Sequence, residues 1–418
     1  MEMKIEKVTG FQCSLCKKIY NLDEVTYNCP SDGGNLDVLL DMDAINRSSS
    51  PKKIKASREL SLWRYLPLLP VPDPGFNGTP IHQAGYTPVY TMPTLAKGLG
   101  IDRLWIKDES RNPTASFKDR ASAIVVSRAL DTKTEIVVTA STGNAGAALA
   151  GMAAAVGQKA IIFAPRTAPQ AKIAQLLVFG AKVILVDGNY DQAFDLTIEA
   201  SSEFGWYCRN TGYNPFTAEG KKTAAFEIWE QVLLANTLDK PLSIFIPVGD
   251  GNIISGIHKG FKDLLALGWL EKMPRLYGIQ TRGSSAIANA FLSGTETIKP
   301  VKADTIADSI SVDLPRDGVR AVRAATETGG AYLVVDDRDA LIAIAELGKV
   351  GIFAEPAGAT AYAGMRKAVK DGFIHKDDPV LVLNTGSGLK DVRAAMQAVR
   401  EAPVIEPSLK SLKQHLNI

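Results

Sequence analysis

The segment Asn112-Pro113-Thr114-Ala115-Ser116-Phe117-Lys118-Asp119-Arg120 is the most informative part of this chain for its architecture. It follows an apolar run at 104–107 that is typical of a buried strand, and the proline at its start indicates a turn. We expect Ser116 to cap a helix that carries Lys118 in its first turn. A helix dipole is positive at that end, so it lowers the pKa of such a lysine and favours the free amine, the nucleophilic form. On this placement alone Lys118 would be an ordinary solvated lysine at a helix start, and it becomes a catalytic candidate only together with the other motifs.

Short apolar strands alternate with amphipathic helices over most of the remaining chain. The predicted strands lie at 104–107, 135–140, 160–164, 182–186, 243–247, 276–279 and 380–383, and the predicted helices at 144–156, 170–179, 190–204, 221–235 and 359–371. This alternation predicts an α/β fold with parallel sheets covered by helices on both faces. There are more strands than one modest sheet needs, so we expect two three-layer lobes. Ligands in such folds bind at the carboxyl ends of the strands.

Three further loops follow predicted strands, at 140–146, 247–253 and 384–391. The first presents backbone N–H groups with the hydroxyls of Ser141 and Thr142, which suits a carboxylate. The second has two glycines that let the backbone approach a phosphate closely. A hydroxyl in the third can bond a ring nitrogen without protonating it. Any one of these loops could be an ordinary turn, but together with an activated lysine they predict a cofactor site.

These segments, in this order, resemble those of the fold-type II enzymes that use pyridoxal 5'-phosphate (PLP), the tryptophan synthase β family. The resemblance covers residues 84–395, from Gly85-Tyr86-Thr87-Pro88 onward. Within that family the chain is most similar to the threonine synthases. The sequence departs from their pattern at Ala115 and Ala121, where glycine is usual, and at Ser387, where many carry histidine. The stretch Ile306-Ala307-Asp308-Ser309-Ile310-Ser311-Val312 resembles threonine dehydratases as much as synthases.

The resemblance implies a role for each site residue. Lys118 would hold PLP as a Schiff base and act as the proton shuttle. The other cofactor contacts would be Asn144 on the ring hydroxyl, Thr385 on the ring nitrogen, and Gly249, Asp250, Gly251, Asn252 and Ile253 on the phosphate. The substrate-binding candidates are Ser141 and Thr142 for the carboxylate, with Ser116, Lys107, Asn214 and Lys221 as further candidates around the substrate phosphate.

The resemblance also implies the reaction. A threonine synthase converts O-phospho-L-homoserine and water to L-threonine and phosphate, so the partner would be a small amino-acid substrate. The nearest alternative is a PLP-dependent threonine or serine dehydratase, which needs no pocket for a substrate phosphate. A more distant alternative is a non-catalytic adaptor that carries a degenerate enzyme body.

The first 45 residues form a separate zinc-ribbon-like module in this interpretation. Cys13-Ser14-Leu15-Cys16 and Cys29-Pro30-Ser31-Asp32 have the spacing of two zinc knuckles, with Asp32 at the fourth ligand position. The alternative is a ribbon without metal that is held by its own small core. The enzyme body would then consist of a large PLP-binding lobe, residues 46–115 and 216–418, and a small mobile substrate lobe, residues 116–215.

Bulk composition limits the remaining possibilities. The 418 residues include 47 Lys and Arg against 45 Asp and Glu, so no basic excess points to nucleic acid. Apolar runs fall well short of the ~20 residues that span a bilayer, and the N-terminal residues lack an apolar signal core. Four cysteines do not make a disulfide framework. We therefore expect a cytoplasmic enzyme and, from the resemblance, a homodimer.

Overall fold

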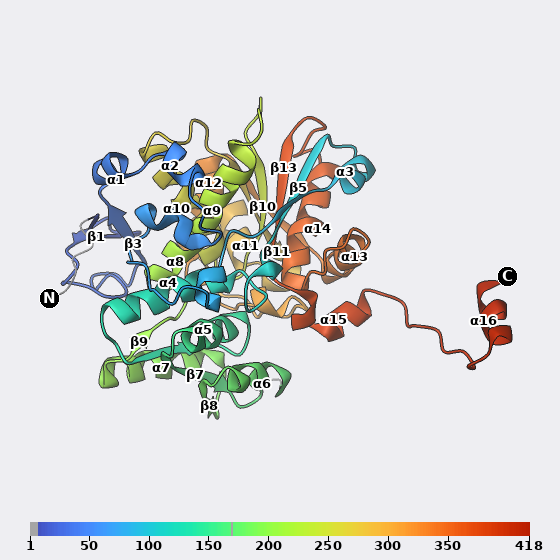
Figure 1. Ribbon diagram of the computed structural model, residues 1–418, viewed down its shortest axis with the longest axis horizontal. Helices are drawn as coiled ribbons and strands as arrows, with labels where there is room; N and C mark the ends of the chain where they lie inside the picture. Colours follow the sequence, from blue (N-terminus) through green and yellow to red (C-terminus); the bar gives the residue numbers. More distant parts are fainter. Residues whose placement is uncertain (1–6, 169) are drawn as a thin grey trace.

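Two separate sheets organise the chain, as seen in a computed structural model that describes residues 7–168 and 170–418 (Figure 1). The larger sheet has the strand order β12-β11-β10-β13-β5-β4 and the smaller β8-β7-β6-β9. The six strands of the first are β4 (Val89–Thr91), β5 (Arg103–Asp108), β10 (Ser243–Pro247), β11 (Arg275–Thr281), β12 (Ala331–Val335) and β13 (Pro379–Asn384). The four of the second are β6 (Ile136–Ala140), β7 (Lys159–Pro165), β8 (Lys182–Val186) and β9 (Tyr207–Cys208). The two predicted parallel-sheet lobes are confirmed, except that the edge strand β4 runs antiparallel to β5.

Helices cover both faces of each sheet. In the large lobe these are α3 (Pro93–Leu99), α8 (Phe216–Lys221), α9 (Thr223–Ile228), α10 (Asn252–Ala266), α11 (Ala286–Leu292), α12 (Gly318–Thr328), α13 (Asp337–Gly348) and α14 (Pro356–Lys370). In the small lobe they are α4 (Lys118–Asp131), α5 (Asn144–Ala155), α6 (Gln170–Val178) and α7 (Tyr190–Phe204). The remaining helices are α1 (Met42–Ser48) and α2 (Pro51–Lys55) near the N-terminus, and α15 (Val392–Gln397) and α16 (Leu409–Leu416) at the C-terminus. In Figure 1, α16 lies apart from the body of the molecule.

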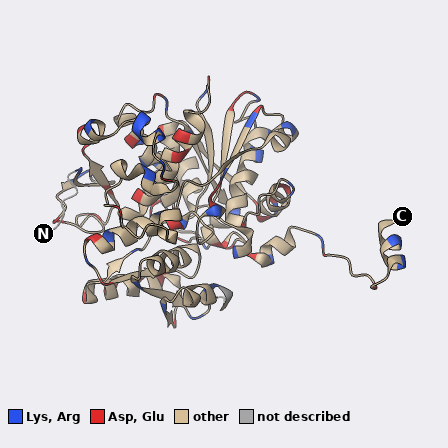
Figure 2. Cartoon of the chain, viewed as in Figure 1, with Lys and Arg blue, Asp and Glu red and all other residues tan. Residues whose placement is uncertain are grey.

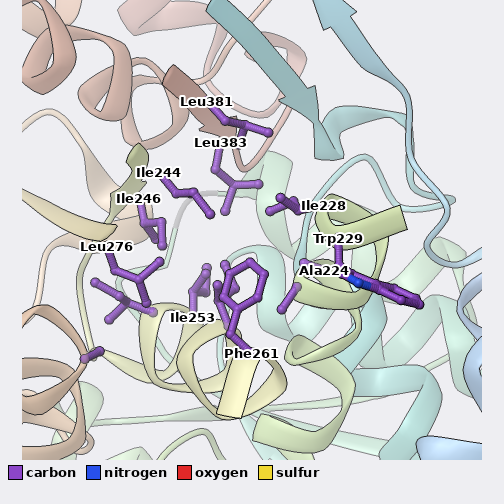
Figure 3. Close-up of a cluster of buried hydrophobic side chains, with 14 of the residues drawn as sticks. Ala224, Ile228, Trp229, Ile244, Ile246, Ile253, Phe261, Leu276, Leu381 and Leu383 are labelled. Atoms are coloured by element: carbon purple, nitrogen blue, oxygen red, sulfur yellow. The ribbon is translucent and has the colours of Figure 1, made fainter. Parts of the chain in front are cut away.

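The core of the large lobe lies between its sheet and α10. Figure 3 shows Ile244, Ile246, Leu276, Leu381 and Leu383 of the strands facing Ile253 and Phe261 of α10, with Ala224, Ile228 and Trp229 beside them. Residues on the other face of the sheet pack against α13 and α14. Burial on both faces explains why these strands are continuously apolar. The carboxyl ends of the parallel strands β10 and β13 therefore lie at the same edge of the sheet.

A small antiparallel sheet precedes the two lobes. Its order is β2 (Ile19–Tyr20), β1 (Val8–Cys13) and β3 (Leu36–Leu40). Its buried residues continue into the core beneath α4 and α5. The N-terminal module is thus packed onto the enzyme body.

Some sequence predictions were wrong in detail. The helix predicted at 221–235 is broken, because α8 ends at Lys221, α9 follows, and a π-helical turn covers Trp229–Leu233. Residues Leu62–Leu68 form a 3-10 helix that was not among the predicted elements. Ser116 does not cap α4, since the helix begins at Lys118 without a side-chain cap. In the sheets of the two lobes, the strands β4, β9 and β12 were not predicted.

Charged residues of both signs are interspersed over the ribbon in Figure 2. Among the described helices, none has both the length and the apolar character that crossing a membrane requires.

Candidate active site

A cavity of about 460 Å³ opens where the carboxyl ends of β6 and β10 face each other. It is lined from both lobes. Of the residues that the sequence singled out, it brings together Lys118, Ser141, Thr142, Asn144, Lys221, Gly249, Asp250, Gly251, Asn252 and Ile253. Loops distant in the chain therefore meet as expected for a ligand site at strand ends.

Lys118 is half-buried at the start of α4 and lines this cavity. Burial lowers the pKa of its amine, and the neighbouring Arg209 lowers it further, while the Glu355 carboxylate opposes the shift. A lowered pKa increases the fraction of neutral amine near neutral pH. Lys118 is thus a suitable nucleophile for an aldehyde.

The loop after β10 forms a cup at the N-terminus of α10. A Cβ on Gly249 would lie 2.8 Å from Ile310 Cα, and one on Gly251 would lie 2.7 Å from Ala321 Cβ. Gly251 also has a φ of +91°, which favours glycine. Only glycine therefore fits at these two positions, and the cup that they form lies at the positive end of a fifteen-residue helix, which suits an anion.

Asn252 connects this cup to two charged residues. Its Oδ1 accepts a hydrogen bond from Lys221 Nζ at 2.6 Å, and its Nδ2 donates to Asp317 Oδ2 at 2.7 Å. Asp317 is buried and also accepts from Arg320 of α12 and from Asn35 of the N-terminal module, at 2.6 Å and 3.0 Å. The module thus braces the cup through a chain of hydrogen bonds.

Asn144 joins the two lobes at the other side of the cavity. Its Nδ2 donates to both carboxylate oxygens of Glu355, at 2.9 and 3.0 Å, and to Ser309 Oγ at 3.1 Å. Burial raises the pKa of Glu355, whereas the adjacent Lys118 lowers it. A Cβ on Gly386 would lie 2.3 Å from Glu355 Oε1, so glycine there makes room for the carboxylate. No motif indicated this contact, because Glu355 lies outside every segment that was singled out from the sequence.

Four predicted site residues lie outside the cavity lining. Thr385 is buried directly after β13, and its carbonyl accepts a hydrogen bond from Phe117 N at 2.9 Å, beside Lys118. Ser116 forms a bridge with Gly386, and its buried hydroxyl has no partner among the described residues. The residue before it, Ala115, has a φ of +61°, which accounts for the glycine usual at this position.

Lys107 and Asn214 have partners within the protein. The fully buried Lys107 Nζ lies 2.7 Å from Glu227 Oε2, and the same carboxylate pairs with Arg120. Asn214 donates to the carbonyl of Cys208 at 2.7 Å and accepts from Phe216 N at 2.9 Å, at the start of α8. The structure therefore places these two residues outside the cavity lining, each with hydrogen-bond or ion-pair partners of its own.

Arg209 is the cavity residue that sequence reasoning missed most clearly. It follows β9, which has only two residues and therefore no recognisable strand pattern. Burial lowers the pKa of its guanidinium to about 10, which leaves it charged at neutral pH. The cavity thus contains a cation that no motif indicated.

The cavity suits PLP by the chemistry of its lining. An amine, a glycine cup at a helix N-terminus and a hydroxyl-bearing loop correspond to the aldehyde, the phosphate and a substrate carboxylate. The family described as pyridoxal-phosphate dependent enzyme matches residues 82–386. Fold, cavity and this match define the class of the protein, a PLP-dependent enzyme.

Relatives that align over nearly their full length identify the family within this class. The chain is 38% identical to the threonine synthase of Methanocaldococcus jannaschii, over 97% of this chain and 98% of that protein. It is 36% identical to the threonine synthase of Methanosarcina acetivorans, over 96% and 97%. The chain belongs to the threonine synthase family of PLP-dependent lyases.

Solved structures agree on the fold. Threonine deaminase isoform 2 from Solanum lycopersicum matches with a TM-score of 0.66 and 23% identity, over 81% of this chain and 94% of that one. A likeness at this level of identity shows the fold alone. The dehydratase alternative therefore has only a distant structural neighbour in its favour.

The four predicted metal ligands lie together in the N-terminal module. One ligand atom each of Cys13, Cys16, Cys29 and Asp32 lies within 4.8 Å of all the others. Cys16 Sγ is 3.8 Å from Cys29 Sγ, and Cys13 Sγ is 3.3 Å from Asp32 Oδ1. Asp32 also accepts backbone N–H groups from Cys16 and Gly34, at 3.1 and 2.8 Å.

Proposed function

We propose that this chain converts O-phospho-L-homoserine and water to L-threonine and phosphate. The observation that carries the proposal is the cavity in which Lys118 faces both the 249–253 cup and the 141–144 loop. Membership of the threonine synthase family supports the choice of substrate.

The residues around the cavity would have the following roles in binding and catalysis. The cup at Gly249–Ile253 holds the cofactor phosphate, and Ser141 and Thr142 bind the substrate carboxylate through hydroxyl and N–H groups. When bound, PLP supplies an electron sink for negative charge at Cα. The Lys118 amine removes the Cα proton and carries protons between the substrate carbons while phosphate leaves Cγ and water adds at Cβ.

Two further contacts would hold the cofactor ring. Thr385 presents a neutral hydroxyl to the ring nitrogen, which favours elimination and replacement over transamination. Asn144 lies where it can reach the ring hydroxyl if it gives up one of its bonds to Glu355. Both assignments predict a shift in the visible absorption of the holoenzyme when the side chain is replaced by alanine.

A substrate panel tests the reaction. The holoenzyme should release phosphate from O-phospho-L-homoserine and form threonine, and Lys118→Ala should do neither. Formation of 2-oxobutyrate from threonine, with no phosphate release from phosphohomoserine, would instead make the chain a dehydratase.

We also propose that the N-terminal module holds one zinc ion. Tetrahedral zinc with Zn–S bonds of about 2.3 Å separates two thiolates by about 3.8 Å, which matches the distance between Cys16 and Cys29. Metal analysis of the purified protein should give one zinc per chain, lost in Cys16→Ser but kept in Cys208→Ser, because Cys208 is outside the cluster. Absence of any bound metal from the wild type would refute the site.

A further inference from the structure

Arg209 is a buried cation with no carboxylate partner among the described residues. Its Nη1 donates to Thr211 Oγ1 at 2.7 Å and its Nε to Ser122 Oγ at 3.3 Å. Its Nη2 is also buried and has no partner within the described part of the chain. Burying an unpaired charge is costly, so such a group normally meets an anion.

The neighbouring charges make a bound anion more favourable. The pKa of Lys221 is lowered by burial and then by the positive charges of Arg209 and Lys118. The Asp250 carboxylate acts on Lys118, Arg209 and Lys221, but burial raises its own pKa, which weakens its value as a counter-ion. Among the described residues, Arg209 therefore lacks a paired negative charge, although acidic side chains such as Asp250 and Asp313 also line the cavity.

Two phosphates could supply that charge, one on the cofactor and one on the substrate. Lys221 is committed to the cofactor cup through its 2.6 Å hydrogen bond to Asn252. Arg209 reaches the cavity from the small lobe, directly after β9 and beside Tyr190 at the start of α7. The cup belongs to the large lobe, so the two cationic groups approach the cavity from opposite sheets.

We propose that Arg209 binds the phosphate of the substrate, an inference that rests on the proposed function. A guanidinium with a free Nη2 offers parallel N–H donors, the geometry that phosphate oxygens accept best. Arg316 also lines the cavity, but its charge is already matched. Its Nη2 lies 3.0 Å from Asp191 Oδ1, and its guanidinium packs over the ring of Phe194.

The test compares Arg209→Gln and Arg209→Lys with wild-type holoenzyme, and uses Arg282→Gln as the matched control. Arg282 is an exposed arginine paired with Asp336 outside the cavity. Four quantities are measured: KM and kcat for O-phospho-L-homoserine, the Kd of inorganic phosphate by calorimetry, the Kd of L-threonine from the visible absorption of bound PLP, and PLP content after dialysis.

We expect Arg209→Gln to raise KM by about 100-fold, the scale of losing one buried charge-assisted contact, and Arg209→Lys to raise it by about 10-fold. Phosphate affinity should fall in parallel, because product and substrate share the site. The Kd of threonine, which carries no phosphate, and the PLP content should match the control.

Three results would overturn the assignment. Loss of PLP with unchanged phosphate affinity would place Arg209 on the cofactor phosphate. Equal weakening of threonine and phosphohomoserine would place it on the shared amino-acid part. If Arg209→Gln does not fold, an unchanged KM in Arg209→Lys would contradict the assignment of Arg209 to the substrate phosphate. Calorimetry with phosphate does not depend on turnover, so a failure of the proposed reaction in the wild type is seen separately.

Discussion

Replacing Asp317 with asparagine should weaken cofactor binding, although this residue does not line the cavity. The Asp317 carboxylate holds Asn252 of the cup at 2.7 Å and Arg320 of α12 at 2.6 Å. A hydrogen bond to a charged group contributes roughly 1.5–3 kcal/mol. Asparagine keeps one acceptor oxygen, so we expect a loss of about 1.5–2 kcal/mol, which is a 10- to 30-fold rise in the Kd of PLP.

The assay is titration of the apoenzyme with PLP, followed by its visible absorption. The control is Asp37→Asn, which removes the negative charge from the 2.7 Å contact between Asp37 and the same Arg320 but leaves the bond from Asp317 to Asn252 intact. If both variants bind PLP as tightly as the wild type, Asp317 does not support the cup. If both weaken binding equally, the effect comes from Arg320 and α12 rather than from Asn252.

Three other predictions concern single lysines. Lys118→Ala should abolish both the visible absorption of added PLP and phosphate release; retained turnover would mean that another group moves the protons. The rate of PLP incorporation into the apoenzyme should rise with pH as Lys118 loses its proton. It should level off below pH 10.5, the ordinary lysine pKa, because burial lowers the pKa of Lys118 in the folded protein. A rate that levels off only above pH 10.5 would contradict this. Lys107→Met should cost about 3–5 kcal/mol of stability, because it leaves part of the Glu227 charge unpaired. The variant should therefore have a lower Tm and an unchanged KM. A higher KM with an unchanged Tm would instead indicate that Lys107 contacts the substrate.

Several predictions made from the sequence are left without a structural test. The homodimer and the cytoplasmic location stay predictions, as do the boundaries of the two lobes and the mobility of the small one. The strands of the smaller sheet, β6 to β9, all lie between residues 136 and 208, which is within the range 116–215 predicted for the small lobe. α4, however, packs closely against both α5 and α8, so it bridges the lobes.

The sequence by itself determined the class of fold and the loops that carry chemistry. Buried parallel strands are continuously apolar and glycine-rich turns follow them, so 243–247 and 249–253 were recognisable from local pattern. Lys118 was identified in the same way, from the segment around it. These features depend on residues close together in the chain.

Only the tertiary structure decided which partners the buried charged side chains have. Lys107 looked available but pairs with Glu227, 120 positions along the chain, and Asn144 pairs with Glu355, more than 200 positions away. Arg209 carried no motif, yet it faces the cavity without a carboxylate partner in the described residues. A buried charge is defined by what surrounds it in space, and no local pattern records those neighbours.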